Sequence, residues 1–319
     1  MSSAAYVFSA MWTTMRPYLL FVSAITGIAG MSLTTTVSPL LLIFVFVASF
    51  FAYGFGQALT DCFQTDTDAI SAPYRPLVSG AVSRRPILLM SITGLCLCAG
   101  VFAYREPWNL ALGALAGIGL TTYTPLKRRW WGGPWYNAWI VVVLCFMAFL
   151  AATSNHESQL PASFLPMLTT VFFGYANFVL SGYFKDVEAD SKTGYETLPV
   201  VFGRSVAAFA SDVLAIGFLV AASWTAATAL HVGPLRSSHL RSLLFGIPGV
   251  FHILAGQLQL HRNRCDAEAF RPILHVVRSY LLILSALAVL LRPDWIVFLT
   301  FHYCAFSIVL ARRPEVTQI

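Results

Sequence analysis

Two short acidic segments lie at the ends of apolar stretches of this chain, and their side chains are of a kind that binds divalent metal ions. Residues 60–68 and 185–190 hold six of the fourteen acidic residues, namely Asp61, Asp66, Asp68, Asp186, Glu188 and Asp190. Ionisable groups next to a membrane interior are costly unless they face a partner, water or a metal. This concentration of carboxylates predicts a site that holds a metal ion against a phosphorylated ligand.

The spacing within each segment places oxygen ligands on a shared helical face. If one helix continues through the first segment, Asp61, Gln64 and Asp68 face the same cavity, at about 100° per residue. Asp186 and Asp190 are one turn apart, where two carboxylates repel each other unless a cation joins them. Such ligands suit Mg²⁺, which is commonly held by one or two carboxylates together with substrate phosphates.

The composition indicates what must position these segments. Of 319 residues, 57% are hydrophobic and only 11% are charged, and the mean hydropathy is +0.71. So little polar material cannot cover a soluble globule of this size. The sequence therefore predicts an all-α integral membrane protein, in which residues 1–319 form one transmembrane domain. The six cysteines include no CxxC pair and indicate neither a disulfide framework nor a zinc site.

Ten stretches reach the length of about 20 residues that a bilayer crossing requires. They lie near residues 16–35, 39–63, 86–105, 108–125, 135–153, 162–184, 204–230, 241–260, 271–291 and 294–312. Because the tract 265–278 is amphipathic, one of the last two stretches could lie in the interface, so nine or ten spans are expected. The two acidic segments follow spans two and six, which suggests two four-helix units around a central cavity.

The distribution of basic residues predicts the orientation. Ten spans place fifteen of the twenty Lys and Arg residues on the side that carries both termini and both acidic segments, and only four on the other side. Loops rich in Lys and Arg stay in the cytoplasm, so the acidic segments and the termini are expected there. Residues 1–6 lack the basic region of a cleavable signal.

Three segments carry a resemblance to a known family. The run 68–80, DAISAPYRPLVSG, resembles the first signature of the UbiA superfamily of intramembrane prenyltransferases, in the form seen in chlorophyll synthases. Residues 183–203, YFKDVEADSKTGYETLPVVFG, resemble the second signature, and residues 123–129, YTPLKRR, resemble the basic segment between the two. The three matches occur in the family's order and spacing, so the chain is identified as a member of this superfamily.

The first signature departs from the family pattern. Members usually have Asn or Asp, then Asp, then Asp at four-residue intervals, where this chain has Thr60, Gln64 and Asp68. Asp61 can replace the first of these ligands, and Gln64 offers an amide oxygen. The resemblance thus implies a metal site formed by Asp61, Gln64, Asp68, Asp186 and Asp190. The catalytic residues among them would be Asp68, Asp186 and Asp190.

The resemblance also implies the chemistry. Members use Mg²⁺ and basic side chains to ionise an isoprenyl diphosphate, and the allylic cation then reacts with a lipophilic acceptor, here expected to be aromatic. Negative charge grows on the departing diphosphate, where metal and cations stabilise it most. The candidates for diphosphate binding are Arg75, Lys127, Arg129 and Lys185. The candidates for the wall of the substrate pocket are Tyr123, Asn177 and Tyr183.

Parts of this pattern also fit simpler roles or a different activity. The basic residues fit topology markers, Asn177 fits a contact between helices, and Asp66 and Glu188 fit solvated helix ends. A UbiA-type terpene cyclase, which needs no acceptor, is the alternative enzyme. A transporter is the non-enzymatic alternative, but it predicts acidic residues deep within spans rather than at their ends. The expected partners are an isoprenyl diphosphate, the acceptor and the lipid bilayer, without nucleic acid.

Overall fold

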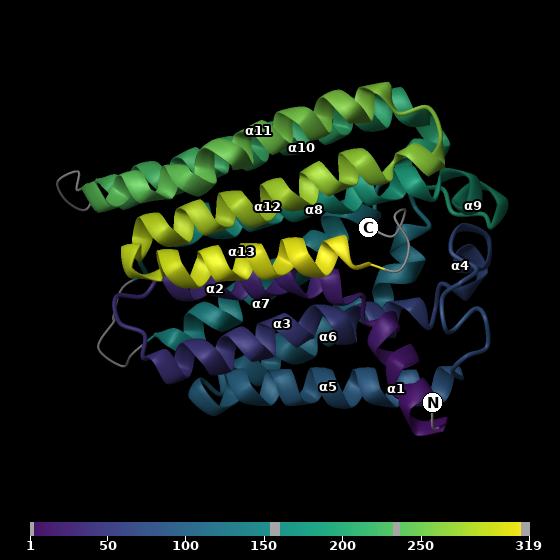
Figure 1. Cartoon of the computed structure of the whole chain (residues 1–319), viewed down its shortest axis with the longest axis horizontal. Helices are drawn as coiled ribbons and strands as arrows, with labels where there is room; N and C mark the ends of the chain where they lie inside the picture. Colours follow the sequence, from purple (N-terminus) through teal and green to yellow (C-terminus); the bar gives the residue numbers. More distant parts are fainter. Residues whose placement is uncertain (1–2, 154–159, 232–236, 314–319) are drawn as a thin grey trace.

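The computed structural model describes residues 3–153, 160–231 and 237–313, and all regular structure within these ranges is helical. The long helices lie side by side along the longest axis of the molecule (Figure 1). They are α2 (Leu20–Ser32), α3 (Pro39–Asp61), α5 (Arg84–Arg105), α6 (Trp108–Lys127), α7 (Gly133–Ala152), α8 (Phe164–Gly182), α10 (Leu198–Leu230), α11 (Leu243–Arg262), α12 (Phe270–Leu291) and α13 (Ile296–Ala311). Shorter helices are α1 (Ser3–Thr14), α4 (Thr65–Ser71) and α9 (Val187–Lys192), with single turns η1 (Pro17–Leu19), η2 (Tyr183–Lys185), η3 (Ser237–Ser242), η4 (Asp266–Glu268) and η5 (Pro293–Trp295).

The helices confirm the predicted all-α membrane bundle. In the described ranges, eight helical stretches are long and apolar enough to cross a membrane. The other two expected spans are α6, with 20 residues, and the shorter apolar stretch Pro17–Ser32. The amphipathic tract that was a candidate for the interface leads into α12, and 78% of the apolar window of that stretch is buried inside the molecule. It is therefore a core helix of the bundle.

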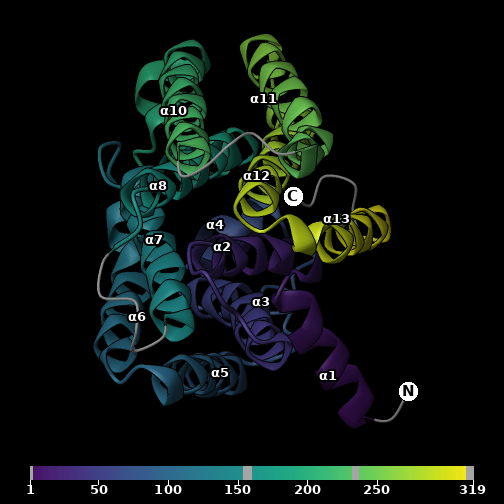
Figure 2. The ribbon, with the colours of Figure 1, turned by 90° about the vertical axis from the view of Figure 1, so that its left-hand side faces the viewer.

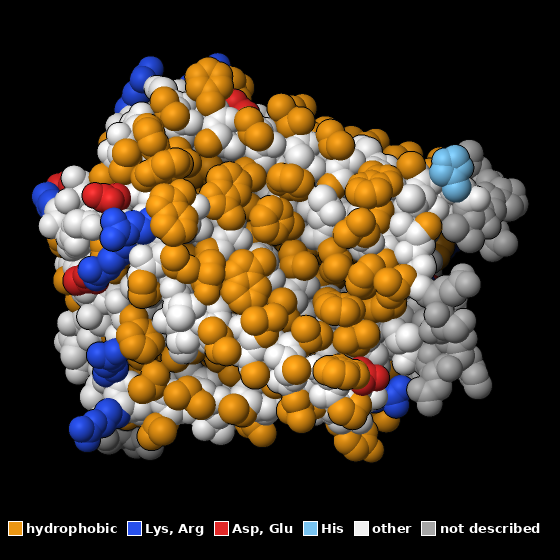
Figure 3. Space-filling view, turned by 180° about the vertical axis from the view of Figure 1, so that it is seen from behind, with side chains coloured by type: hydrophobic (Ala, Val, Ile, Leu, Met, Phe, Trp, Pro, Cys, Tyr) orange, Lys and Arg blue, Asp and Glu red, His pale blue; other side chains and the backbone are white. Residues whose placement is uncertain are grey.

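The surface fits a lipid environment. Hydrophobic side chains cover the middle of the face shown in Figure 3, while most Lys and Arg side chains visible there gather at one end. Large apolar side chains such as Leu89, Phe209 and Ile216 are more than half exposed. An exposed apolar surface this broad is typical of a protein surrounded by acyl chains.

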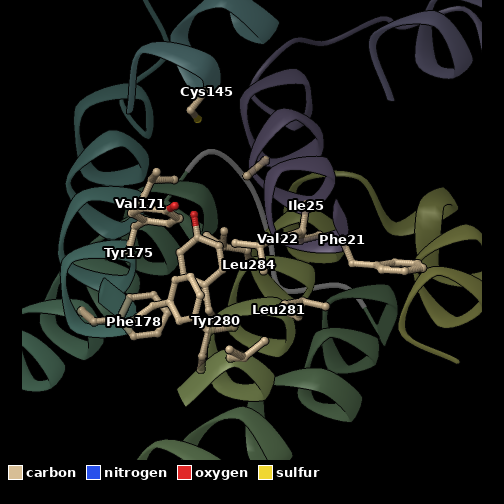
Figure 4. Packing of buried hydrophobic residues seen from close by; sticks show 14 of the residues in the cluster. Phe21, Val22, Ile25, Cys145, Val171, Tyr175, Phe178, Tyr280, Leu281 and Leu284 are labelled. Carbon is tan, nitrogen blue, oxygen red and sulfur yellow. The ribbon is translucent and has the colours of Figure 1, made fainter. Parts of the chain in front are cut away.

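The interior of the bundle is built where α2, α8 and α12 meet. Figure 2 shows α2 with α3 on one side and with α8 and α12 on the other. Helix α2 contacts α3, α7 and α12. Aromatic rings fill this junction, where Tyr280 lies beside Tyr175 (Figure 4). The Phe218 ring stacks on Tyr280, with the ring centres 6.1 Å apart. The Tyr280 hydroxyl is buried but lies 2.7 Å from the Thr26 hydroxyl, so its hydrogen-bonding capacity is used.

The first acidic segment is interrupted rather than helical throughout. Helix α3 ends at Asp61, and its last turn tightens because the amides of Cys62 and Phe63 donate to carbonyls three residues back. Helix α4 begins only at Thr65. The prediction that Asp61 and Asp68 share one face of a continuous helix is therefore wrong. The Thr and Asp side chains of this run favour turns and caps over helix interiors.

The second acidic segment is also a short connection between long helices. The chain leaves α8 through η2, passes Asp186 and forms the six-residue helix α9. Gly194 and Gly203 then adopt φ of 73° and 81°, which suits glycine and allows the chain to turn after α9 and again within α10. Helices α4 and α9 contact each other at one end of the bundle (Figure 1).

Candidate functional site

One cavity of about 220 Å³ connects the charged end of the bundle to its apolar interior. Its walls come from η1, α2 to α8 and η2, and no described residue of α10 to α13 lines it. Of the residues singled out from the sequence, it is lined by Gln64, Asp68, Arg75, Tyr123, Lys127, Tyr183, Lys185 and Asp186. The structure thus brings both acidic segments and the basic segment of residues 123–129 to one hollow.

The charged end combines carboxylates with an excess of cations. The Arg75 guanidinium forms a close ion pair with the Asp68 carboxylate, and these side chains are only 12% and 9% exposed. Lys185 and Asp186 reach the same hollow from the end of α8. Burial of this kind makes charge interactions stronger than at a surface, because water screens them less.

Lys127 lies between the two acidic segments. Its ammonium group donates to the Gln64 side-chain oxygen at 3.3 Å and lies 3.6 Å from the Asp190 carboxylate. It also lies over the rings of Tyr183 and Tyr195, 5.4 and 5.1 Å from their centres. Lys127 is therefore one of the cations that relieve the repulsion expected within the second segment, and it is the last residue of α6.

The carboxylates of the site differ in pKa because their surroundings differ. Burial raises the pKa of Asp68, and the charge of Arg75 offsets this only in part. Burial likewise raises the pKa of Asp190, to about 6, although the positive charge of Lys127 acts to lower it. Burial acts in the same direction on Asp186, but the surrounding cations, Lys185 first among them, outweigh it and lower the pKa. Asp186 is thus the carboxylate held most firmly in its ionised form.

Asp61 and Asp190 lie outside the cavity wall. The Asp61 carboxylate accepts hydrogen bonds from Arg16, at 2.9 and 3.1 Å, and from Gln57, at 2.6 Å. Asp190 is fully buried, and its Oδ2 atom accepts from the Thr197 hydroxyl at 3.2 Å. Its Oδ1 atom has no hydrogen-bond partner in the described part of the chain apart from the longer ion pair with Lys127.

Two further candidates also point away from the cavity. Asn177 is buried in the contact between α8, α10 and α11, where its side-chain oxygen accepts from Ser211 at 2.5 Å and from Gln257 at 3.3 Å. Arg129 forms an exposed ion pair with Glu196 at 3.7 Å. The environment of Asn177 matches a contact between helices rather than a wall of the substrate pocket.

The two acidic segments are also joined outside the cavity. The Asp66 carboxylate accepts from Arg128 at 2.9 Å and from the Tyr195 hydroxyl at 3.3 Å, and the hydroxyls of Thr67 and Thr193 lie 3.2 Å apart. These contacts connect α4, the end of α6 and the turn after α9. They hold α4, which carries Asp68, next to the segment that carries Asp186.

The uncharged part of the cavity extends into the bundle. The cavity as a whole is lined from α6 by Gly113 and Lys127, which are fourteen residues apart, a rise of about 21 Å along a helix. Its inner wall includes Phe102, Leu144 and Met147 from α5 and α7. Near the charged end, the hydroxyls of Tyr123 and Tyr183 lie 2.9 Å apart and place two aromatic rings between the ionic and apolar parts.

The oxygen chemistry of the charged end fits a magnesium ion that is completed by a ligand. Asp68 and Asp186 line the same hollow, and one oxygen of Asp190 behind them lacks a hydrogen bond in the described structure. In the described part of the chain, however, no group of three or more His, Cys, Asp or Glu side chains lies close enough together to hold a metal ion. Magnesium tolerates this, because substrate phosphates and water supply its remaining ligands.

Sequence reasoning missed Arg16. This residue lines the cavity and holds Asp61, yet it is the first residue of the first expected span and lies 45 residues from its partner in the sequence. The only signal in the sequence is an isolated cation at the start of an apolar span, directly before Pro17.

Comparison with known proteins identifies relatives of this chain. A model of the UbiA prenyltransferase family matches residues 20–276. The chain is 31% identical over 186 residues to the digeranylgeranylglyceryl phosphate synthase of Natronomonas pharaonis, which covers 58% of this chain and 64% of that one. It is 26% identical over 177 residues to the bacteriochlorophyll synthase 33 kDa chain of Cereibacter sphaeroides, covering 53% and 57%. The chain thus aligns with less than two thirds of either relative's length.

Solved structures share the fold. A UbiA homolog from Aeropyrum pernix K1 superposes with a TM-score of 0.66 at 17% identity, over 83% of this chain and 94% of that one. A UbiA homolog from Archaeoglobus fulgidus bound to DMAPP and Mg²⁺ superposes with a TM-score of 0.59 at 16% identity, over 93% and 99%. At these identities the likeness concerns the fold alone.

Proposed function

The chain belongs to the UbiA prenyltransferase family and is an integral, multi-pass membrane protein, and from this premise we propose that it transfers an isoprenyl group from its diphosphate to a lipophilic acceptor. One observation carries the proposal: a single cavity has carboxylates and cations at one end and a long apolar wall beyond them. A substrate with a diphosphate head and a hydrocarbon tail matches both parts.

The charged end would hold the diphosphate. Mg²⁺, when bound with the diphosphate, would neutralise the charge that develops as the carbon–oxygen bond breaks. Asp186 and Asp68, which line the cavity, are the side chains we propose to hold it. Arg75, Lys127 and Lys185 would bind the phosphate oxygens, with Arg as a planar fork and Lys as point charges. Arg129 forms an exposed ion pair with Glu196, so we assign it no role in diphosphate binding.

The remaining metal candidates have different parts in this proposal. Gln64 lines the cavity and would orient Lys127, to which it is hydrogen-bonded. Asp190 would act from behind the wall by fixing the position of Lys127. Neither Asp61 nor Asn177 touches the bound substrate in this arrangement, because both are engaged elsewhere.

The apolar part would hold the hydrocarbon tail and protect the allylic cation from water. Each isoprene unit adds about 5 Å when extended at ordinary carbon–carbon bond lengths, so the roughly 15 Å of α6 between Tyr123 and Gly113, beyond the charged end, accommodates about three extended units. The rings of Tyr123 and Tyr183 lie where the cation would form, and aromatic faces stabilise cations by about 0.5–2 kcal/mol. We therefore propose a donor of at least farnesyl length.

The acceptor is proposed only as lipophilic. The relatives' names include a glyceryl phosphate lipid and a chlorophyll pigment as products, so an aromatic acceptor is one option among lipophilic ones. We place the α4–α9 end on the cytoplasmic side, because Lys and Arg gather there.

The test is product analysis with purified protein in lipid nanodiscs. Farnesyl or geranylgeranyl diphosphate is supplied with Mg²⁺, first alone and then with a prenyl-glyceryl phosphate, a chlorophyllide or a quinone precursor. Transfer predicts turnover only with an acceptor, release of diphosphate and a proton, and a product whose mass is that of the acceptor plus the prenyl group minus one hydrogen. A cyclic hydrocarbon formed without acceptor would show instead that the chain is a terpene cyclase.

A further inference from the structure

The two acidic segments differ in what neutralises them, and Asp61 is the clearest case. The Nη2 group of Arg16 donates to both Asp61 oxygens, and Gln57 donates to one of them. The Asp61 side chain is only 5% exposed and that of Arg16 is 13% exposed. A magnesium ion needs oxygen ligands at about 2.0–2.1 Å, and a guanidinium already lies against the Asp61 oxygens.

The backbone of Arg16 supports a specific role for its side chain. Among the described residues it is the only one other than glycine with a positive φ, at φ 52° and ψ 71°. A residue with a side chain rarely adopts the left-handed region, because its Cβ atom comes too close to the following carbonyl oxygen. Such strain persists where the surrounding structure requires it, and it is often found at functional sites. Here it delivers the guanidinium to the cavity wall immediately before Pro17 opens η1.

The other polar side chains of the first acidic segment are also engaged with protein groups. Thr60 is uncharged and donates to a carbonyl of its own helix. The Gln64 side chain is used by Thr124 and Lys127, at 3.3 Å each. Asp68 has Arg75 as its ion-pair partner. The end of α3 therefore offers no group of oxygen atoms that is ready to hold a metal ion of its own.

We propose that Arg16 takes the place of a metal ion on the α3 side of the cavity, so that this protein binds one divalent cation, on the Asp186 side, per diphosphate. Nη2 is occupied by Asp61, Arg16 makes no other side-chain hydrogen bond within the described ranges, and the residue lines the cavity, so its remaining N–H groups are available to a ligand there. Arginine stays charged and contacts phosphate oxygens in a fixed geometry. This inference rests on the proposed function, because it concerns how the same diphosphate is held.

Metal counting tests the proposal without turnover. The whole chain in nanodiscs is saturated with geranylgeranyl S-thiolodiphosphate, which resists ionisation, and bound Mn²⁺ is counted by electron paramagnetic resonance and calorimetry. One Mn²⁺ per bound analogue is expected. Two would overturn the inference while leaving the proposed function intact, whereas an analogue that does not bind at all would overturn both.

Matched variants separate a metal ligand from a counterion. Asp61→Asn should leave the Mn²⁺ count at one and its affinity within about threefold, while Asp186→Asn should abolish Mn²⁺ binding. Loss of Mn²⁺ from a folded Asp61→Asn protein would overturn the inference. Both variants keep the side-chain shape, and thermal melting shows that each is folded before metal is counted.

Arg16 itself is tested through binding of the diphosphate. The double variant Arg16→Gln/Asp61→Asn removes both charges together, so that no buried charge is left unpaired. It should bind the analogue about 10- to 100-fold more weakly, as expected for the loss of a charge-assisted contact, and still bind one Mn²⁺. Arg85→Gln, an exposed change at the start of α5, should not alter the affinity. An affinity of the double variant equal to that of wild type would contradict the role of Arg16.

Discussion

The two acidic segments look alike in sequence, but they are neutralised in different ways. In the first, Asp61 and Asp68 are each paired with an arginine. In the second, Asp190 lies beside Lys127, and Asp186 faces the cavity with its pKa lowered by the surrounding cations. Asp61, which is held by both Arg16 and Gln57 outside the cavity wall, contributes little to metal binding, whereas Asp186, which is surrounded by cations in the cavity, stays ionised and accessible. A count of carboxylates in the sequence therefore overstates the number of metal ligands.

Removal of the metal should have the largest effect. EDTA is expected to abolish turnover and excess Mg²⁺ to restore it, because Mg²⁺ stabilises the departing diphosphate. The fold should survive, since the buried carboxylates of the first segment keep their arginine partners. Product formation and thermal melting are followed in the same samples. Full activity in EDTA would mean that fixed cations suffice in both segments.

Asp186 should be the most sensitive single residue. Asp186→Ala is expected to lower kcat at least about 10³-fold, an effect of the size seen when a key electrostatic contact to a transition state is lost. Glu188→Ala is the matched control, because Glu188 lies in the adjacent α9, is 67% exposed and pairs with Lys192. Its kcat should stay within twofold of wild type. Comparable losses in the two variants would remove the distinction between cavity-facing and solvated acids.

Substitution of Arg75 should have an effect of intermediate size, and Arg129 provides the comparison. Arg75→Ala should lower kcat/KM about 10²-fold, because it removes a phosphate contact and leaves Asp68 without its ion pair. Arg129→Ala should change it less than threefold, since its pair with Glu196 is about 60% exposed on both sides. Steady-state kinetics with the same donor measure both. If Arg129 proved as important as Arg75, diphosphate binding would extend outside the described cavity.

Asp66 should show the smallest effect. It accepts from Arg128 and Tyr195 across the two segments but is 43% exposed, so Asp66→Asn is expected to cost less than about 1 kcal/mol of stability. Activity should stay within about threefold of wild type. Thermal melting and kinetics check the two expectations. A complete loss of activity would show that the contact between α4 and α9 depends on this carboxylate.

Much of the fold could be predicted from the sequence, because a long apolar run in a membrane must satisfy its backbone hydrogen bonds internally, as a helix does. Helices occupy each of the expected spans within the described residues, and both acidic segments lie at the same end of the bundle. The approach of Asp68, Lys127 and Asp186 to one cavity followed from the order of the spans. The family assignment from residues 68–80 and 183–203 is confirmed.

The partners of individual side chains within the site could not be predicted from the sequence. The face shared by Asp61 and Asp68 assumed a continuous helix, but α3 stops at Asp61 because the local side chains favour a turn. Arg16 reaches Asp61 through a backbone conformation that no periodicity reveals. Asn177 turned toward α10 and α11, because buried amides seek partners that only tertiary packing provides. Such contacts depend on how helices far apart in sequence are placed, which spacing rules do not contain.

The most direct test of the account is the release of inorganic diphosphate from geranylgeranyl diphosphate in the presence of a lipophilic acceptor, measured for wild type and Asp186→Ala with and without Mg²⁺. The account predicts release by wild type only with Mg²⁺, and none above background from a folded Asp186→Ala protein. Equal release by the two proteins, or release by wild type that does not depend on Mg²⁺, would contradict it.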